Sequence, residues 1–265
     1  MTARASKTFY VDSEERISGT SSNFYYQLSI PGGLKPDTCC VLNMIVPRSF
    51  YLIRAGYNRM NVIADNLVYP IEIEPGNYHV NNFSSTLLGL LNALGVGVFD
   101  IQFSSVTGKY KYGYMGAAAS VAFQFEDPSR LAHQTGFDEI STNHFVAGVL
   151  VSKNVLNFIS TSTLFLHSDM VDDGSDILQE MYAENTIPFA NLVYTCKVPS
   201  LYSKKLRNDT SGVFHFSLCD EHDKEVDLNG HDICITLSLY RKEDVTKTFQ
   251  KGFDALLRSQ EDDEY

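Results

Sequence analysis

The sequence has no tryptophan, few cysteines and fewer basic than acidic residues. The cysteines and the charge each exclude certain classes of protein. The five cysteines are odd in number and form no C-x-x-C pair. We therefore expect free thiols and a reducing compartment, not a disulfide scaffold or a zinc finger. Only 21 basic residues stand against 32 acidic ones, a net charge of −11. This balance argues against broad wrapping of nucleic acid, which needs a basic surface.

Long apolar runs are also missing. The longest, over residues 87–99, is interrupted by Gly89 and Asn92, and it is shorter than the ~18–20 residues of a membrane span. The first seven residues have no apolar core, so we expect neither a signal peptide nor a transmembrane segment. Hydrophobic residues make up 44% and charged residues 20% of the 265, which is typical of a globular chain.

The apolar residues that are present occur mostly in short alternating runs. Phe24, Tyr26, Leu28 and Ile30 share one face at the spacing of a β-strand. Similar alternating runs, bounded by turn residues, recur along the chain. Their period of two residues predicts about ten strands. They are expected over 39–53, 60–64, 68–73, 98–103, 109–114, 121–125, 155–166, 190–198, 213–218 and 233–240.

In one segment the apolar residues follow the period of a helix instead of a strand. Apolar residues recur at helical spacing, which predicts an amphipathic helix over 82–94 that begins at Asn81 or Asn82 and ends before Gly95. Shorter helical pieces are expected at 129–134 and 177–181. Many strands, one substantial helix and no β-α-β alternation predict an all-β, antiparallel sandwich.

The chain is expected to form one domain over residues 23–243, between two arms. Residues 1–22 are mostly polar, with a Ser/Gly-rich connector, and residues 244–265 end in a run of acidic side chains. The N-terminal arm combines charged residues with apolar ones such as Phe9 and Val11, which suits docking onto a neighbour. A frayed terminus explains the same composition equally well. If the segment is a docking arm, we expect that deleting residues 1–20 leaves a folded body that assembles poorly.

The sequence lacks the common motifs of catalytic and metal-binding sites. The Gly108-Lys109 pair does not complete a phosphate-binding loop, because Phe103 stands where the motif has its first glycine and Tyr110 where it has Ser or Thr. The seven histidines show no close ligand spacing, and the acidic stretch 220–230 lacks the register of a calcium loop. No serine-hydrolase motif is present. We expect no catalytic residues, no metal site and no cofactor.

Several motifs, in this order, resemble those of penton proteins, the single jelly-roll minor capsid proteins of Polintons, virophages and large eukaryotic DNA viruses. The opening segment 10–19 followed by Phe24 resembles the family's N-terminal signature. Further matches of the same kind lie at 74–78 before the helix, at 131–137, at 164–171 and at 233–241. The loop after Asp220 departs from the family, because it is longer and more acidic than the usual tight turn.

The resemblance implies a single jelly-roll β-sandwich with one inserted helix, and no enzymatic activity. It implies a homopentamer at the vertices of an icosahedral virus shell, assembled inside the host cell and in contact with the major capsid protein. Other minor capsid proteins and a vertex spike are further candidate partners; no specific nucleic acid is expected. The candidate interface residues are the charged and aromatic residues of the arm and three residues beside turns: Arg4, Lys7, Tyr10, Asp12, Arg16, Arg48, Tyr51 and Tyr57.

Three alternatives stay open at this point. A jelly roll also suits a carbohydrate- or receptor-binding module, although a secreted lectin would usually carry a signal peptide and paired cysteines. A different minor capsid position would use the same fold. A cupin-like metalloenzyme would use it too, with a stoichiometric metal as its mark.

Overall fold

The computed structural model describes residues 6–125, 131–158, 161–172, 174–183, 190–207 and 212–242. They form two compact units, each with a hydrophobic core of its own. One unit takes in the described residues up to Phe50 and from Thr161 onward, and the other spans Tyr51–Ser160. We call them the jelly-roll unit and the inserted unit. The single domain expected over 23–243 is thus divided, and the expected tail 244–265 lies outside the described residues.

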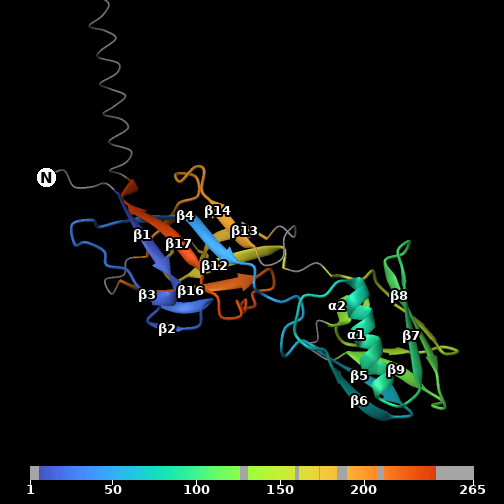
Figure 1. The fold of residues 1–265 in the computed structure, drawn as a ribbon. Coiled ribbons are helices and arrows are strands. Elements are labelled where there is room, and N and C mark those ends of the chain that lie inside the picture. Colours follow the sequence, from blue (N-terminus) through green and yellow to red (C-terminus); the bar gives the residue numbers. More distant parts are fainter. Residues whose placement is uncertain are drawn as a thin grey trace, which may run out of the picture. The chain divides into compact units, whose positions relative to one another are not determined.

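The jelly-roll unit is built on two antiparallel sheets (Figure 1). The first sheet contains, in pairing order, β1 (Ser6–Asp12), β17 (Cys234–Tyr240), β4 (Thr38–Pro47) and β14 (Asn191–Thr195), with β15 (Lys204–Lys205) also on β4. The second contains β13 (Ile177–Tyr182), β12 (Thr163–Ser168), β16 (Val213–Asp220), β3 (Asn23–Gln27) and β2 (Ser18–Gly19).

The strand order identifies the architecture. Without the two-residue strands β2 and β15, the unit has eight strands in chain order. The first, eighth, third and sixth form one sheet, and the fifth, fourth, seventh and second form the other, which is the order of a jelly roll. The sequence-based prediction of an all-β jelly roll is confirmed. The inserted unit enters the chain between the third strand, β4, and the fourth, β12.

The core of the jelly-roll unit lies between its two sheets, because inward side chains alternate with outward ones along each strand. On β3, for example, Phe24 and Tyr26 are buried, and Phe24 stacks on Phe216 of β16. β4 ends at Pro47, as its missing N–H predicts.

The N-terminal segment differs from the expected arm. Residues 6–12 form β1, which pairs with β17 along its whole length, so the first and last strands of the described chain are neighbours in the first sheet (Figure 1, blue beside red). Phe9 and Val11 point into the core, with Val11 only 1% exposed. Deleting residues 1–20 would therefore remove a core strand instead of a loose arm.

The inserted unit has two smaller antiparallel sheets and two helices. The third sheet contains, in pairing order, β10 (Ser141–His144), β9 (Val121–Phe125), β5 (Arg59–Ala64) and β6 (Leu67–Glu72). The fourth contains β11 (Val149–Val151), β8 (Lys109–Met115) and β7 (Val98–Ser104). The helices are α1 (Val80–Ala93) and α2 (Leu131–Thr135). Aromatic rings fill the core, including Tyr112, which lies edge-on to Phe123 with ring centroids 5.1 Å apart.

The helix expected over 82–94 is α1. It buries Phe83, Leu87 and Leu91, and the chain leaves it through Gly95 at φ 71°. Its N-cap is His79 instead of an asparagine: His79 Nδ1 accepts from the Asn82 N–H at 3.4 Å, and Asn82 Oδ1 accepts from the His79 N–H at 2.7 Å. Within the described residues, neither helix is long and apolar enough to cross a membrane.

The segment 177–181 also differs from its prediction as a helical piece, because it lies within β13. The register between β13 and β12 shifts at Leu166/His167, and Leu178 has no partner across that shift. The resulting bulge places Leu178 and Met181 on the same buried side at a spacing of three, which mimics a helical pattern.

Candidate assembly surfaces

The expected interface residues of the N-terminal segment lie on β1 and on the turn that follows it. Tyr10 is 77% exposed, because it points away from the core between Phe9 and Val11. Lys7 lies with Nζ 4.8 Å from the centre of the Phe9 ring and donates a hydrogen bond to the Ser29 carbonyl at 3.4 Å. Arg4 lies outside the described residues. Of this group, Tyr10 is the side chain most available to a partner.

Asp12 and Arg16, in contrast, hold the turn together. Asp12 caps the single 3₁₀ turn Ser13–Glu15, where its Oδ1 accepts from the Glu14 N–H at 3.0 Å. Arg16 Nη1 donates to the Ser13 carbonyl at 2.7 Å and to Asp232 Oδ1 at 3.3 Å. Ser13 is buried and donates to the same Asp232 oxygen at 2.7 Å. The proposed interface role of Asp12 and Arg16 stays a prediction, and the structure adds a structural role for both.

The other three expected residues are divided between the two units. Arg48 follows β4 in the jelly-roll unit, half-buried, and its N–H donates to the Ala190 carbonyl at 2.9 Å. Tyr51 is the first residue of the inserted unit, and Tyr57 stands in a turn where its N–H donates to the Arg54 carbonyl at 3.1 Å. Both tyrosines are half-buried. The seven described candidates therefore do not form one continuous surface of one unit.

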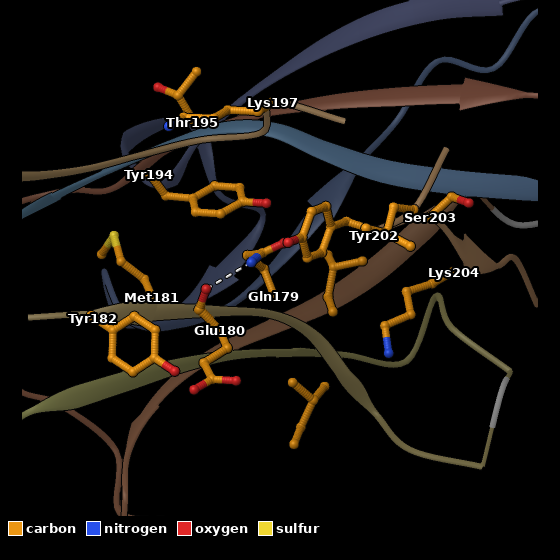
Figure 2. A pocket seen from close by; sticks show the side chains of 13 residues that line it. Gln179, Glu180, Met181, Tyr182, Tyr194, Thr195, Lys197, Tyr202, Ser203 and Lys204 are labelled. Atoms are coloured by element: carbon orange, nitrogen blue, oxygen red, sulfur yellow. Dashed lines mark hydrogen bonds between the residues drawn. The ribbon is translucent and has the colours of Figure 1, made fainter. Parts of the chain in front are cut away.

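A groove that the sequence did not indicate lies between β13 and β14, the strands at one edge of the two sheets (Figure 2). Its volume is about 620 Å³. Figure 2 shows Tyr194 and Tyr202 extending into it from one side and β13 passing on the other. Predicting 177–181 as a helical piece hid the groove, because the strand β13 at that position forms one of its walls.

Aromatic rings and a few charges line the groove. Tyr182 and Tyr202 are exposed, and Leu201 is 71% exposed beside them. Burial raises the pKa of Tyr194, and the hydrogen bond and charge interaction with the Cys196 thiol raise it further, so the phenol stays protonated at neutral pH. Gln179 Nε2 donates to the Glu180 carbonyl at 2.7 Å (Figure 2, dashed line). The groove is thus mainly apolar, with polar groups at its margin.

Exposed apolar side chains of the jelly-roll unit gather at two opposite edges. β1 and β2 end the two sheets on one side, and β14 and β13 end them on the other. Near the β1/β2 edge, the exposed side chains are Tyr10, Ile17 and Tyr25. At the β13/β14 edge they are Tyr182, Val193, Val198, Leu201 and Tyr202. The jelly-roll unit thus has two different exposed apolar surfaces, one at each edge.

The expected loop 220–230 is more firmly fixed than its acidic sequence indicates. Val226 and Leu228 are fully buried in the core. Glu225 accepts hydrogen bonds from Thr20 Oγ1 at 2.8 Å, Ser22 Oγ at 3.1 Å and Asn23 Nδ2 at 3.1 Å. Burial alone would raise the pKa of Glu225, but these hydrogen bonds outweigh it and hold the pKa below its ordinary value. The loop is therefore tied to the β2–β3 turn.

Three of the five cysteines, Cys39, Cys40 and Cys219, are buried, and all five are free thiols. Cys40 Sγ lies 3.8 Å from Cys196 Sγ, and burial together with the neighbouring thiols raises the pKa of Cys40 to about 12. Cys219 belongs to the group of metal-ligating side chains formed with His167 and Asp223. Cys219 and Asp223 are four residues apart, but His167 lies 52 residues before Cys219, which is why spacing alone could not indicate the group.

No protein-family profile matches the sequence, and no curated protein does. Among solved structures, the crystal structure of the selenomethionine-labelled mavirus penton protein is similar to this chain, with a TM-score of 0.43 and 11% sequence identity. The alignment covers 88% of this chain and 99% of that one. That protein is of the family whose motifs the sequence resembles.

Proposed function

We propose that the chain is a structural capsid protein that forms a homopentamer at the vertices of an icosahedral double-stranded DNA virus shell and contacts the major capsid protein. The jelly roll is a common architecture of viral capsid subunits, and the motif resemblance of the sequence supports the vertex position. In this role the protein resides in the virion, is assembled in the reducing interior of the host cell, and has a structural function rather than an enzymatic one.

The observation that carries the proposal is the pair of apolar surfaces at opposite edges of the jelly-roll unit. In a closed ring, each subunit offers one surface to the neighbour before it and a different surface to the neighbour after it. Tyr10, at the β1/β2 edge, is placed to enter the groove at the β13/β14 edge of the next copy. Aromatic residues of this kind are enriched in the energetically dominant parts of interfaces.

The contact with the major capsid protein would then use surfaces that take no part in the ring contacts. The inserted unit has exposed apolar side chains of its own, among them Val106, Met115 and Ile140. A vertex spike and other minor capsid proteins would compete for the same surfaces.

Native mass measured by light scattering, with negative-stain images of the same peak, tests the ring. We expect about 150 kDa, five copies of a 29.7 kDa chain, and a five-fold ring. A strict monomer at high protein concentration would contradict assembly through these edges.

Charge substitutions at the two edges test which surfaces meet. Tyr10→Glu and Leu201→Glu should each give monomers, because each removes one half of the contact. Mixed together, the two variants should form dimers of about 60 kDa and nothing larger, because each keeps one intact surface. Val106→Glu, at a fully exposed position of the inserted unit, is the matched control and should leave the ring intact. Dimers formed by either edge variant alone would indicate a symmetric contact and refute the proposed arrangement.

The groove itself favours one second candidate, a carbohydrate- or receptor-binding module. Its volume of about 620 Å³ lies in the range of small-molecule sites, and three tyrosines stand along it. A glycan array separates the two functions: binding that is lost in Tyr202→Ala, by a chain that stays monomeric, would favour the binding module.

A further inference from the structure

Three side chains with metal-binding atoms meet on the outer face of the second sheet. The ligating atoms of His167, Cys219 and Asp223 all lie within 4.8 Å of one another. Among the residues that the structure describes, this is the one group of three or more such side chains at that spacing. Cys219 is buried and His167 half-buried, while Asp223 is exposed.

The fold brings these residues together from two distant parts of the sequence. His167 on β12 and Cys219 on β16 belong to neighbouring antiparallel strands, where His167 is opposite Ser217 and Phe165 is opposite Cys219. His167 and Cys219 are therefore diagonal neighbours on one face of the sheet. Asp223 comes from the loop after β16, at φ 58°, a left-handed conformation that aspartate tolerates. The loop folds back so that Asp223 Oδ1 lies 3.7 Å from His167 Nε2.

A fourth residue orients the histidine. Asp176 Oδ1 lies 3.1 Å from His167 Nδ1, on the side of the ring away from the group. A carboxylate that accepts the Nδ1 proton leaves the Nε2 lone pair directed at Cys219 and Asp223. This is the arrangement by which proteins hold a metal-ligating histidine in the correct tautomer.

Acidic side chains surround the Cys219 thiol. Burial raises the pKa of Cys219, and the charges of Asp223, Asp220 and Glu225 raise it further, while the hydrogen bond with Ser217 lowers it. The same negative surroundings that disfavour a thiolate favour a divalent cation bound to it. A bound divalent cation would neutralise part of the negative charge of Asp220, Asp223 and Glu225.

We propose that His167 Nε2, Cys219 Sγ and a carboxylate oxygen of Asp223 bind one zinc ion, with water as its fourth ligand. A set of one nitrogen, one sulfur and one oxygen suits zinc and disfavours magnesium and calcium, which prefer oxygen alone. Zinc ligands in a tetrahedron lie roughly 3.3–3.8 Å apart, as their bond lengths require, and the three atoms, all within 4.8 Å of one another, come near that spacing. The exposed Asp223 side chain is the part that can move inward. The bound ion would fasten the loop after β16 to β12.

Metal titration of the purified full-length chain tests the site. After treatment with a chelator, the protein should bind one equivalent of Zn²⁺, and Co²⁺ in its place should give a thiolate-to-cobalt charge-transfer band and the visible bands of a tetrahedral ion. Cys219→Ser should remove the charge-transfer band. His167→Ala should weaken binding at least 100-fold, and Asp176→Asn, which removes only the orienting carboxylate, should weaken it about 10- to 100-fold.

Two cysteine variants are matched controls. Cys234 also lies beside a carboxylate, with Sγ 3.6 Å from Asp12 Oδ2, and Cys40 belongs to the close thiol pair with Cys196. Cys234→Ser and Cys40→Ser should leave the stoichiometry and the band unchanged. If either control variant removes the band, the metal binds elsewhere and the proposal is wrong.

A variant that keeps the fold guards against misinterpretation of the buried substitution. Asp223→Asn retains the shape and the left-handed backbone of an exposed residue, and it should weaken Zn²⁺ binding at least 10-fold. X-ray absorption of the zinc-loaded wild-type chain should show one sulfur among nitrogen and oxygen ligands. A zinc shell without sulfur, or the absence of binding at micromolar Zn²⁺, would overturn the proposal whatever the variants do.

Discussion

Substitutions along β1 should show that the beginning of the chain is a core strand. Val11→Ala removes two methyl groups from a residue that is 1% exposed. At about 0.8 kcal/mol for each methyl group, and with the cavity that remains, the loss in the free energy of unfolding is about 2 kcal/mol. Tyr10→Ala, one position earlier, removes a ring that is 77% exposed and should cost less than about 0.5 kcal/mol.

Hydrogen exchange in the neighbouring strand is the suitable assay, because two separate cores make a single unfolding midpoint ambiguous. Val11 is opposite Ile235 of β17. A loss of about 2 kcal/mol should speed the exchange of protected β17 amides roughly 30-fold. The exchange of β5 amides should not change, because the core that contains β5 has no residue from β1.

The comparison of the two variants decides between a strand and a loose arm. A loose arm would leave β17 exchange unchanged in both variants. Equal acceleration in Val11→Ala and Tyr10→Ala would also refute the reasoning, since it would mean that the inward and outward positions of β1 do not differ.

Three further predictions concern other parts of the chain. Glu225 has a lowered pKa, so its contribution to stability is fully present above its unfolded-state value near 4.5 and is lost as pH falls through the folded-state value; Glu225→Gln should flatten the loss of stability in acid urea titrations below about pH 4.5. Gly19→Ala should cost at least about 2 kcal/mol of unfolding free energy, because φ is +101° and the added Cβ would lie 2.1 Å from the Asn23 carbonyl oxygen; Ala at the open position Gly89 is the control in the same thermal melts. The segment 51–160, expressed alone, should show cooperative thermal unfolding by circular dichroism, since it has its own core, and a molten, non-cooperative product would contradict its independence.

Local patterns were enough to predict most elements. The alternation of Phe24, Tyr26 and Leu28 predicted β3, and helical spacing from Phe83 to Leu94 predicted α1 to within two residues at its start. Both signals depend on residues near each other in sequence, so the sequence contains all that is needed.

Elements that depend on distant partners were missed. β1 is rich in polar residues and becomes a strand because β17, more than two hundred residues later, offers it a paired edge. β13 was mistaken for a helix because its bulge puts Leu178 and Met181 on one side. The division into two units escaped prediction because β4 leads into Tyr51 without the Gly/Ser-rich linker that marks most boundaries.

The candidate sites were hidden for a related reason. The acidic composition of 220–230 suggested a solvated loop, yet Ser49 Oγ donates to the Leu228 carbonyl at 2.5 Å and Asn229 Nδ2 donates to the Ser49 carbonyl at 2.5 Å. Spacing rules look for ligands within one motif, whereas His167 and Cys219 become neighbours only through strand pairing. Tertiary pairing creates both features, and one-dimensional patterns do not contain it.

The two edges of the jelly-roll unit differ in structure: one carries a projecting tyrosine and the other an open groove. This difference gives the proposed contact a direction. At the β1/β2 edge, Arg16 and Asp232 fasten the turn after β1, and Glu225 fastens the β2–β3 turn, so Tyr10 extends from a rigid support. At the β13/β14 edge a groove remains open. A rigid projection loses little conformational entropy on binding. We therefore expect Tyr10 at the β1 edge of one copy to insert into the groove of the next copy. Every contact around the ring then has the same orientation.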